Sequence, residues 1–343
     1  MHSTRRLLAA TLGVALGVAL GVALGVVLGA CRKDTAPVAA TVSAAPAHAA
    51  FDPAAWKPPA EADIPADSLG ASIRRGLALV MHTVDSLPAY APGNLNCTNC
   101  HINAGRNADA APLAGSHARF PKYMDRTGAV IGLGDRVNYC FTRSLAGSRL
   151  PLESREMEDI LAYLAWLSTG VPAGEGKQLP GAEGLRAMPA GIVGDRARGQ
   201  TVFAGKCAVC HGVDGVGNPA IPPGVPALWG PRSFSVGASM ARQGKAASYI
   251  WHNMPYGSGK TLTPQEAFDV AAYVTSQPRV DSPGKGNDWP AGGTPADVPY
   301  ATTGHTALEP PPLIPRANAA TSIVPRPVPV SRPGATSRKP AGR

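Results

Sequence analysis

The chain has 343 residues, of which 16% are charged and 6% are aromatic, and its formal net charge is +9 at pH 7. This length suits about two domains, and 39 Gly with 35 Pro is too few for a wholly low-complexity chain. Most of the net positive charge lies outside any expected folded domain. It comes from Arg5 and Arg6 and from the residues after Ser282, which include seven Lys or Arg but only three Asp or Glu. The remaining core is nearly neutral, so we exclude nucleic acid as a partner.

The first 31 residues have the pattern of an export signal. Two arginines precede an apolar run over residues 7–30, which ends in Leu28-Gly-Ala-Cys31. A Leu followed by two small residues and a Cys resembles the lipobox of bacterial lipoproteins, in which the Cys receives the lipid. The alternative is an uncleaved membrane helix, because 24 apolar residues can span a bilayer of about 30 Å. Both interpretations place the rest of the chain outside the cytoplasmic membrane, and we expect a periplasmic lipoprotein anchored through Cys31.

Two further segments lack the pattern of a folded domain. Residues 32–60 are rich in Ala and Pro, and we expect them to form a tether. Residues 282–343 contain repeated prolines, as in Glu309-Pro-Pro-Pro-Leu, and few apolar residues to bury. This composition predicts a disordered or polyproline-like tail.

An internal repeat indicates the chemistry of the chain. Residues 97–101 read Cys-Thr-Asn-Cys-His and residues 207–211 read Cys-Ala-Val-Cys-His. C-x-x-C-H is the attachment pattern of haem c, in which two thiols bind the porphyrin and the following His binds the iron. A redox dithiol or half of a zinc site would explain one C-x-x-C, but not two copies that both continue into His. We therefore expect two covalently attached haem c groups, held by Cys97, Cys100 and His101 and by Cys207, Cys210 and His211.

The repeat extends beyond the haem motifs. Each motif follows a helix-like segment with Arg-Gly and precedes an amphipathic segment, with helix starts predicted at Ser154 and Thr263. This order of helix, motif, long loop and helix resembles the class I cytochrome c fold. We therefore expect an all-α protein of two tandem class I cytochrome c-like domains, with long loops that wrap the haems. The predicted boundaries are 61–172 for the first domain, 173–189 for a linker and 190–281 for the second domain.

The sixth iron ligand decides between electron transfer and substrate chemistry. In the second half the candidate is Met254, followed by Pro on a loop that resembles the methionine loop of class I cytochromes c. Because a thioether raises the reduction potential, we expect this haem to transfer electrons out of the protein. His252 and Met240 are weaker candidates.

Cys140 stands at the corresponding place in the first half, 39 residues after His101. Three interpretations are open: Cys140 binds the iron, it is a buried apolar filler, or Met124 or His117 binds the iron instead. A thiolate ligand would lower the reduction potential and could also supply a nucleophilic sulfur.

A longer block of sequence resembles one enzyme family. The run Leu133-Gly-Asp-Arg136-Val-Asn-Tyr-Cys140-Phe-Thr-Arg143-Ser144, with residues 94–101 and 252–255, closely resembles the dihaem thiosulfate dehydrogenases. These are exported proteins of two cytochrome c domains that couple two thiosulfates into tetrathionate. The resemblance implies that Cys140 is the distal ligand of an active-site haem in the first domain.

The same resemblance implies a substrate pocket and an electron-transfer haem. Arg126, Arg136 and Ser144 match residues of the pocket, and Met254 matches the ligand of the second haem. Some members have a Lys directly before that Met. Asn253 stands there in this chain, so we expect fixed His/Met ligation. Two lesser pocket candidates are Lys122 and Arg143.

These residues lead to a working mechanism. Arg126 and Arg136 hold the sulfonate of thiosulfate, because forked guanidinium groups offset its charge and orient it. Cys140 then carries a covalent S-thiosulfonate, and a second thiosulfate attacks it and releases tetrathionate. The electrons leave through the second domain to a soluble cytochrome c or another acceptor. The alternatives are a non-catalytic dihaem electron-transfer cytochrome, a tetrathionate reductase, or the haem subunit of a sulfur-oxidising complex.

Overall fold

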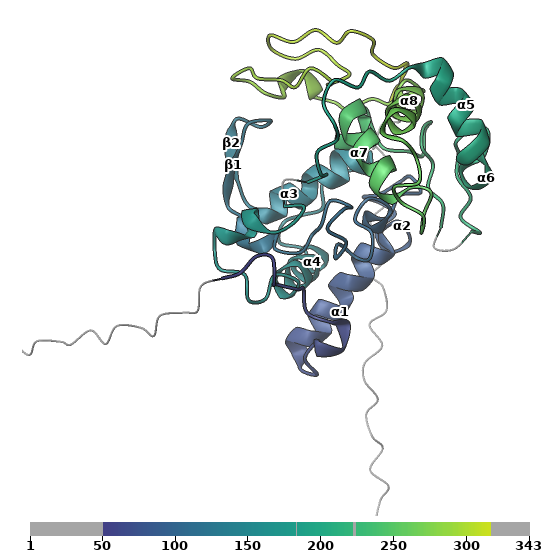
Figure 1. Cartoon of the computed structure of the whole chain (residues 1–343). Helices are drawn as coiled ribbons and strands as arrows, with labels where there is room; N and C mark the ends of the chain where they lie inside the picture. The colour runs from purple at the N-terminus through teal and green to yellow at the C-terminus, as the bar shows by residue number, and fades with distance from the viewer. Residues whose placement is uncertain (1–50, 183, 222–223, 317–343) are drawn as a thin grey trace, which may run out of the picture. The chain divides into compact units, whose positions relative to one another are not determined.

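Helices supply most of the regular structure (Figure 1). The computed structural model describes residues 51–316, except 183 and 222–223, and all of these belong to one unit, Ala50–Arg343. The expected leader, Cys31 and most of the expected tether lie outside the described residues. Within the described part of the chain, no helix has the length and apolar character needed to cross a membrane.

The elements occur in the following order along the chain. The α-helices are α1 (Ser68–Met81), α2 (Thr83–Ser86), α3 (Leu133–Tyr139), α4 (Arg155–Trp166), α5 (Arg196–Lys206), α6 (Ala208–His211), α7 (Gln243–Asn253) and α8 (Pro264–Thr275). A π-helix, Cys140–Ser144, directly follows α3. Short 3-10 helices span Glu61–Asp63, Cys97–Asn99, His117–Arg119, Glu175–Gln178, Ser239–Ala241 and Lys285–Asn287. The strands are the antiparallel pair β1 (Lys122–Met124) and β2 (Ala129–Ile131) and the parallel pair β3 (Arg279–Val280) and β4 (Leu313–Ile314).

Two helices begin where the sequence provides a capping side chain. The Ser154 hydroxyl accepts a hydrogen bond from the backbone N–H of Met157 at the start of α4. At the start of α8, Thr263 and Glu266 cap each other reciprocally, and Pro264 is the first helical residue. Such caps satisfy backbone groups that have no partner inside the helix. Both predicted helix starts are confirmed.

Each haem motif is accompanied by one pair of crossing helices, α1 with α4 and α5 with α8 (Figure 1). A Cβ atom on Gly76 of α1 would lie 1.9 Å from the backbone oxygen of Asp159 on α4. A Cβ atom on Gly199 of α5 would lie 1.9 Å from the backbone oxygen of Asp269 on α8. Only glycine allows the two backbones to approach this closely. The repeat seen in the sequence is therefore a repeat of helix-crossing geometry.

The arginine before each glycine also joins the two crossing helices. Arg75 donates from Nε to Asp159 at 2.8 Å, and Arg198 donates from Nε to Asp269 at 2.8 Å. Both arginines bind with two nitrogens, and both carboxylates are buried. Paired hydrogen bonds of this kind fix the orientation of both partners. The Arg-Gly pair therefore sets both the distance and the rotation of the crossing helices.

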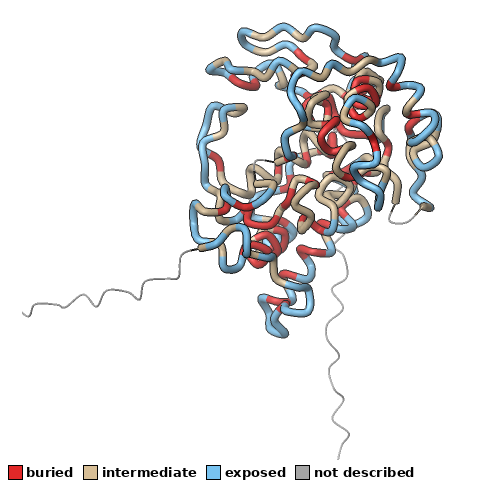
Figure 2. The backbone as a smooth tube through the Cα atoms, in the orientation of Figure 1, coloured by how far each residue is buried: buried red, intermediate tan, exposed pale blue. Residues whose placement is uncertain are grey.

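Buried residues concentrate along α4, α7 and α8 (Figure 2). The first domain contributes the larger core, which includes Ile73, Val80, Phe141, Met157, Ile160, Tyr163 and Leu164. In the second domain, Phe203 of α5 packs on Val270 and Val274 of α8, with Trp229 and Tyr273 against its ring. These cores hold the crossing helices beside the haem motifs.

The structure differs from the predicted tail over residues 282–316. Trp289, Val298 and Tyr300 are buried and pack with Val236 of the second domain. Strand β4, which lies in this stretch, also pairs with β3 at the end of the second domain. The prediction was wrong here because composition averages over a long segment, whereas three large side chains suffice to dock a loop on a domain. Residues 317–343 of the expected tail lie outside the described residues.

The close crossing of α5 and α8 leads to a stability prediction. We expect Gly199→Ala to lower the free energy of unfolding by about 1–3 kcal/mol, because the new Cβ must push the two backbones apart. The measurement is chemical unfolding of the haem-loaded protein followed by circular dichroism.

Gly205 on the same helix provides the matched control. A Cβ atom there would meet no other atom within 4 Å. Gly205→Ala should therefore leave stability unchanged or raise it by up to about 1 kcal/mol, since Ala favours the helix. Equal unfolding midpoints for the two variants would contradict the proposed close contact.

Candidate haem and substrate site

An apolar cavity in the first domain brings the haem motif and Cys140 together. Cys97, Cys100 and His101 line it, and Cys140 and Ser144 join them from the π-helix. The remaining lining is largely apolar and comprises Val80, Leu95, Asn96, Leu113, Val137, Phe141, Leu145, Ile160 and Leu164. Two thiols, an imidazole and a further sulfur around an apolar space fit a haem c with a distal thiolate ligand.

The two predicted proximal histidines share one hydrogen-bonding pattern. His101 Nδ1 lies 2.5 Å from the carbonyl oxygen of Ala111, and His211 Nδ1 lies 3.1 Å from that of Pro226. A carbonyl can only accept, so Nδ1 donates to it, and Nε2 is the ring nitrogen that remains for another partner. A carbonyl on the other ring nitrogen is the usual arrangement behind a metal-binding His. Both histidines are therefore oriented to offer Nε2 to an iron.

Cys140 differs from the other cysteines of this cavity. Arg136, one helical turn earlier, donates from Nη1 to Cys140 Sγ at 3.1 Å, and the thiol also interacts with His101. Burial opposes charge on this sulfur, but Arg136 and His101 outweigh burial and lower the pKa of Cys140 to about 6. Burial instead raises the pKa of Cys97 to about 11 and that of Cys100 to about 12. The thiolate form is favoured at Cys140.

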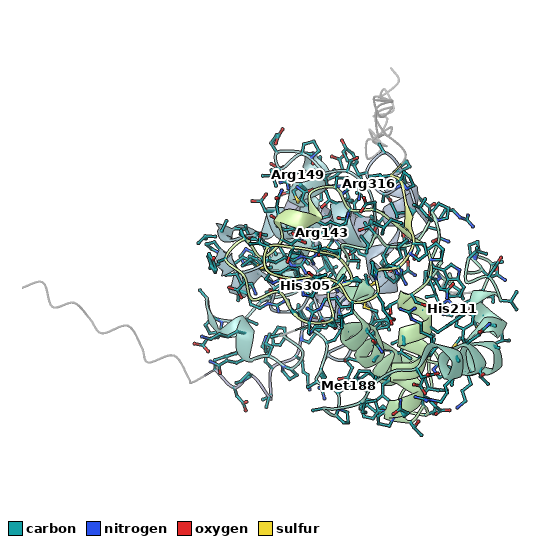
Figure 3. The ribbon with its side chains drawn as sticks, turned by 90° about the horizontal axis from the view of Figure 1, so that it is seen from above. Arg143, Arg149, Met188, His211, His305 and Arg316 are labelled. Atoms are coloured by element: carbon teal, nitrogen blue, oxygen red, sulfur yellow. The ribbon has the colours of Figure 1, made fainter. Side chains whose placement is uncertain are left out.

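The π-helix that carries Cys140 is held from two distant parts of the chain. Ser235 of the second domain donates from its backbone N–H and its hydroxyl to the carbonyl oxygen of Arg143. Arg316 donates to the carbonyl oxygens of Thr142 at 2.6 Å and Gly147 at 2.9 Å, and Figure 3 shows Arg143 and Arg316 in this region. These contacts fix the backbone on both sides of Ser144.

The two arginines predicted to line one pocket, Arg126 and Arg136, have different partners in the structure. Arg126 donates from Nε to Asp288 at 2.9 Å and from Nη2 to Tyr300 and the backbone oxygen of Gly237. Arg143 donates to the other carboxylate oxygen of Asp288 at 2.5 Å. Arg126 therefore lies with Arg143 around Asp288. Arg136 lies on Cys140 and forms no ion pair with a carboxylate among the described residues.

Sequence reasoning missed Asp288 and Tyr300, because both lie in the segment predicted as a tail. Tyr300 also donates from its hydroxyl to Asp288 at 2.7 Å. Each contact with Arg126 spans more than 160 residues, so no local pattern could have indicated it. The only available signal was the large aromatic side chains, Trp289 and Tyr300, within a segment otherwise poor in apolar residues.

The weaker candidates of the first domain lie elsewhere. Lys122 is exposed on β1, and Met124 is half-buried on the same strand. His117 is exposed on a short 3-10 helix. None of the three belongs to the lining of the cavity that holds Cys140.

Met254 lies directly after α7, where it packs with Tyr249, Leu185 and Ile102. Met240 contacts the same cluster. His252 turns its Nδ1 towards the backbone oxygen of Ser248 at 2.8 Å. Cys207 borders the core formed by Phe203 and its aromatic neighbours.

Two families of cytochrome c domains match this chain. Residues 89–173 match the family described as SoxA/TsdA, cytochrome c domain, and residues 196–278 match the cytochrome c family. The thiosulfate dehydrogenase of Psychrobacter arcticus is 41% identical over 253 residues, which are 72% of this chain and 76% of that protein. The chain belongs to the thiosulfate dehydrogenase family. The predicted resemblance, and with it the presence of two cytochrome c domains, is confirmed.

Two further members of the thiosulfate dehydrogenase family extend the comparison. The enzyme of Allochromatium vinosum is 39% identical over 231 residues, 64% of this chain and 83% of that protein. The solved structure of thiosulfate dehydrogenase (TsdBA) from Marichromatium purpuratum matches with a TM-score of 0.61 and 32% identity. That match covers 67% of this chain and 50% of the other, so this chain corresponds to about half of that longer protein.

The Asp288 cluster leads to a second prediction. Asp288 is 3% exposed at its side chain, and Arg126 and Arg143 are 15% and 16% exposed. Asp288→Asn keeps the shape but removes the charge that two half-buried guanidinium groups share. We expect it to lower the free energy of unfolding by about 3 kcal/mol, as for other buried pairs that lose one partner. The check is denaturant unfolding of the haem-loaded protein.

Asp135 serves as the control for this substitution. Its pair with Arg149 has side chains that are 37% and 51% exposed. Exposed pairs contribute little, so Asp135→Asn should change stability by less than about 1 kcal/mol. If Asp288→Asn had no larger effect than Asp135→Asn, the structural importance of the cluster would be refuted.

Proposed function

We propose that this protein is a dihaem c-type cytochrome that oxidises two thiosulfates to one tetrathionate. The observation that carries the proposal is Cys140, which lies in the apolar cavity against His101 with Arg136 on its sulfur. A non-catalytic electron relay would give neither this sulfur nor this arginine a task. Membership of the thiosulfate dehydrogenase family supports the same conclusion.

The proposed cofactors are two covalently attached haem c groups. When bound, the haem of the first domain supplies an electron acceptor next to Cys140. We propose domain boundaries of 61–172 and 190–281 with a linker over 173–189, and loops that wrap the haems. The residues assigned to hold the groups are Cys97, Cys100, His101 and Cys140 in the first domain, and Cys207, Cys210, His211 and Met254 in the second.

Arg136 is the main proposed contact for the substrate dianion. Its guanidinium lies beside the reacting sulfur, and no carboxylate among the described residues neutralises it. It can therefore hold a sulfonate while the sulfane sulfur points towards Cys140. Ser144 lines the same cavity and offers a hydroxyl to the substrate. Arg126 has a smaller part, because its Nε and Nη2 are already bound by the protein.

The proposed reaction has two sulfur–sulfur steps. The Cys140 thiolate and the sulfane sulfur of thiosulfate form a disulfide bond, which gives an S-thiosulfonate and releases two electrons. A second thiosulfate then attacks the sulfane sulfur of this adduct. Tetrathionate leaves, and Cys140 departs as the thiolate with which the cycle began. A c-type cytochrome outside the chain is the proposed final electron acceptor.

We also propose that the protein is exported to the periplasm and anchored by lipid at Cys31. The support is the charged and apolar leader and the Leu-Gly-Ala-Cys sequence at its end. The haem motifs agree with this location, because a c-type haem is attached to an exported chain.

The function is tested by thiosulfate-dependent reduction of an artificial acceptor, with tetrathionate quantified as product. We expect one tetrathionate for two thiosulfates, and we expect Cys140→Ser to lower kcat by at least about 1000-fold, as for the loss of other covalent nucleophiles. The control is haem content, which Cys140→Ser should preserve because Cys97 and Cys100 remain. Normal turnover by a fully haem-loaded Cys140→Ser variant would eliminate the covalent role. Absence of turnover in the intact wild-type protein would favour an electron relay.

Arg136 gives a separate prediction for substrate binding. We expect Arg136→Gln to lower kcat/KM for thiosulfate by about 10- to 100-fold, because a charge-assisted hydrogen bond contributes about 1.5–3 kcal/mol. Arg149 is the control, since its side chain is 51% exposed and pairs with Asp135. Arg149→Gln should leave kcat/KM within about twofold. Equal losses in both variants would show that general positive charge, and not the place of Arg136, attracts the substrate.

A further inference from the structure

Helix α7 of the second domain contacts the haem motif of the first domain through one side chain. The Tyr249 hydroxyl donates to the backbone oxygen of Asn99 at 2.7 Å, and Tyr249 is 6% exposed. Asn99 lies between the two cysteines of the first motif, Cys97 and Cys100. The contact therefore joins α7 to the segment expected to carry the first haem.

Asn253 makes the second contact between these parts. It is the last residue of α7, directly before Met254, and is 6% exposed. Its Nδ2 donates to the backbone oxygen of Asp109 in the first domain at 2.9 Å and to that of Tyr249 at 3.0 Å. Both amide hydrogens are thus used, one within α7 and one across to the other domain.

Asp109 also contacts the loop between α7 and α8 that carries Met254, which we call the Met254 loop. Its carboxylate lies 3.8 Å from Nζ of Lys260, and it pairs with Arg186 of the linker at 2.6 Å. Asn253 precedes Met254 and Lys260 follows it, so one first-domain residue contacts the loop at both ends. Met254 itself packs against Tyr249 and against residues of the first domain.

We propose that Asn253 and Tyr249 are positioning residues that hold the Met254 loop against the first domain. Ligation of the second haem iron by Met254 then depends on contact between the two domains. Methionine has three rotatable bonds and lies on a loop, so its sulfur stays in place only where the backbone beside it is fixed. The inference rests on the proposed role of Met254 as an iron ligand.

The test measures how easily imidazole displaces Met254 in the oxidised, haem-loaded protein. The readout is the weak far-red absorption band of a thioether bound to ferric haem. We expect Asn253→Ala to lower the half-displacing imidazole concentration at least about fivefold, the low end for a lost buried hydrogen bond. Activity with thiosulfate is not needed for this measurement.

Ser248 supplies a matched control on the same helix. It is 2% exposed, and its hydroxyl donates to the backbone oxygen of Arg186 at 2.6 Å, outside the first domain's haem motif. Ser248→Ala therefore also loses a buried hydrogen bond of α7, but it leaves Asn253 and Tyr249 in place. We expect its imidazole titration to stay within about twofold of the wild type.

Three results would overturn the proposal: an unchanged titration for Asn253→Ala, equal shifts for Asn253→Ala and Ser248→Ala, or an unchanged titration for Tyr249→Phe. Tyr249→Phe keeps the ring and removes only the bond to Asn99, so it decides the question if Asn253→Ala does not fold. We expect it to shift the titration in the same direction. A wild-type protein without the far-red band would instead contradict Met254 as the ligand, which separates failure of the proposed function from failure of this inference.

Discussion

The sulfur of Cys140 faces an apolar cavity and yet favours its charged form, and this combination defines the proposed site. An apolar cavity removes water from a thiolate, and burial alone raises the pKa of Cys97 and Cys100, which line the same space. Burial opposes charge on Cys140 as well, but the interactions of Arg136 and His101 with its sulfur outweigh burial and lower its pKa. The cavity therefore contains three thiols but favours the reactive form of only one. Selectivity for that thiol comes from Arg136, one helical turn away, together with His101.

Two other arginines of the first domain, Arg126 and Arg143, stabilise the fold. Asp288 and Tyr300 hold Arg126, and Asp288 also holds Arg143, so the charge of both guanidinium groups is shared with one buried carboxylate. Through these bonds the segment after the second domain is joined to the first domain. Arg136 has no carboxylate partner among the described residues, and it is the proposed contact for the substrate dianion. Arginine side chains therefore have two tasks here: Arg126 and Arg143 bind Asp288, whereas Arg136 lies on Cys140. Only the position of Asp288 in the folded chain distinguishes them.

Local patterns were sufficient to predict the repeat, the helix starts and the residues that meet in the first cavity. The C-x-x-C-H motifs have fixed chemistry, and Arg136 lies four residues before Cys140, a spacing that joins side chains on one helix face. The grouping of Arg126 could not be predicted, because its partners lie 162 and 174 residues away. The docking of residues 282–316 was missed for a related reason. The buried aromatic side chains of Trp289 and Tyr300 help to dock this segment. An average over its proline-rich composition does not register two such residues.

The two halves of the chain place different sulfur atoms at equivalent points of the repeat. Cys140 directly follows the last residue of α3, and Met254 directly follows the last residue of α7. Four residues earlier stands Arg136 in the first half and Ile250 in the second, where Ile250 packs into the core beside Phe203. A thiolate needs a nearby cation, whereas a neutral thioether needs only apolar surroundings. The residue four positions before each sulfur-bearing residue therefore differs, with a guanidinium in the first half and an aliphatic side chain in the second. This difference suits one half of the duplicated scaffold to the proposed reactive centre and the other half to the proposed electron-transfer centre.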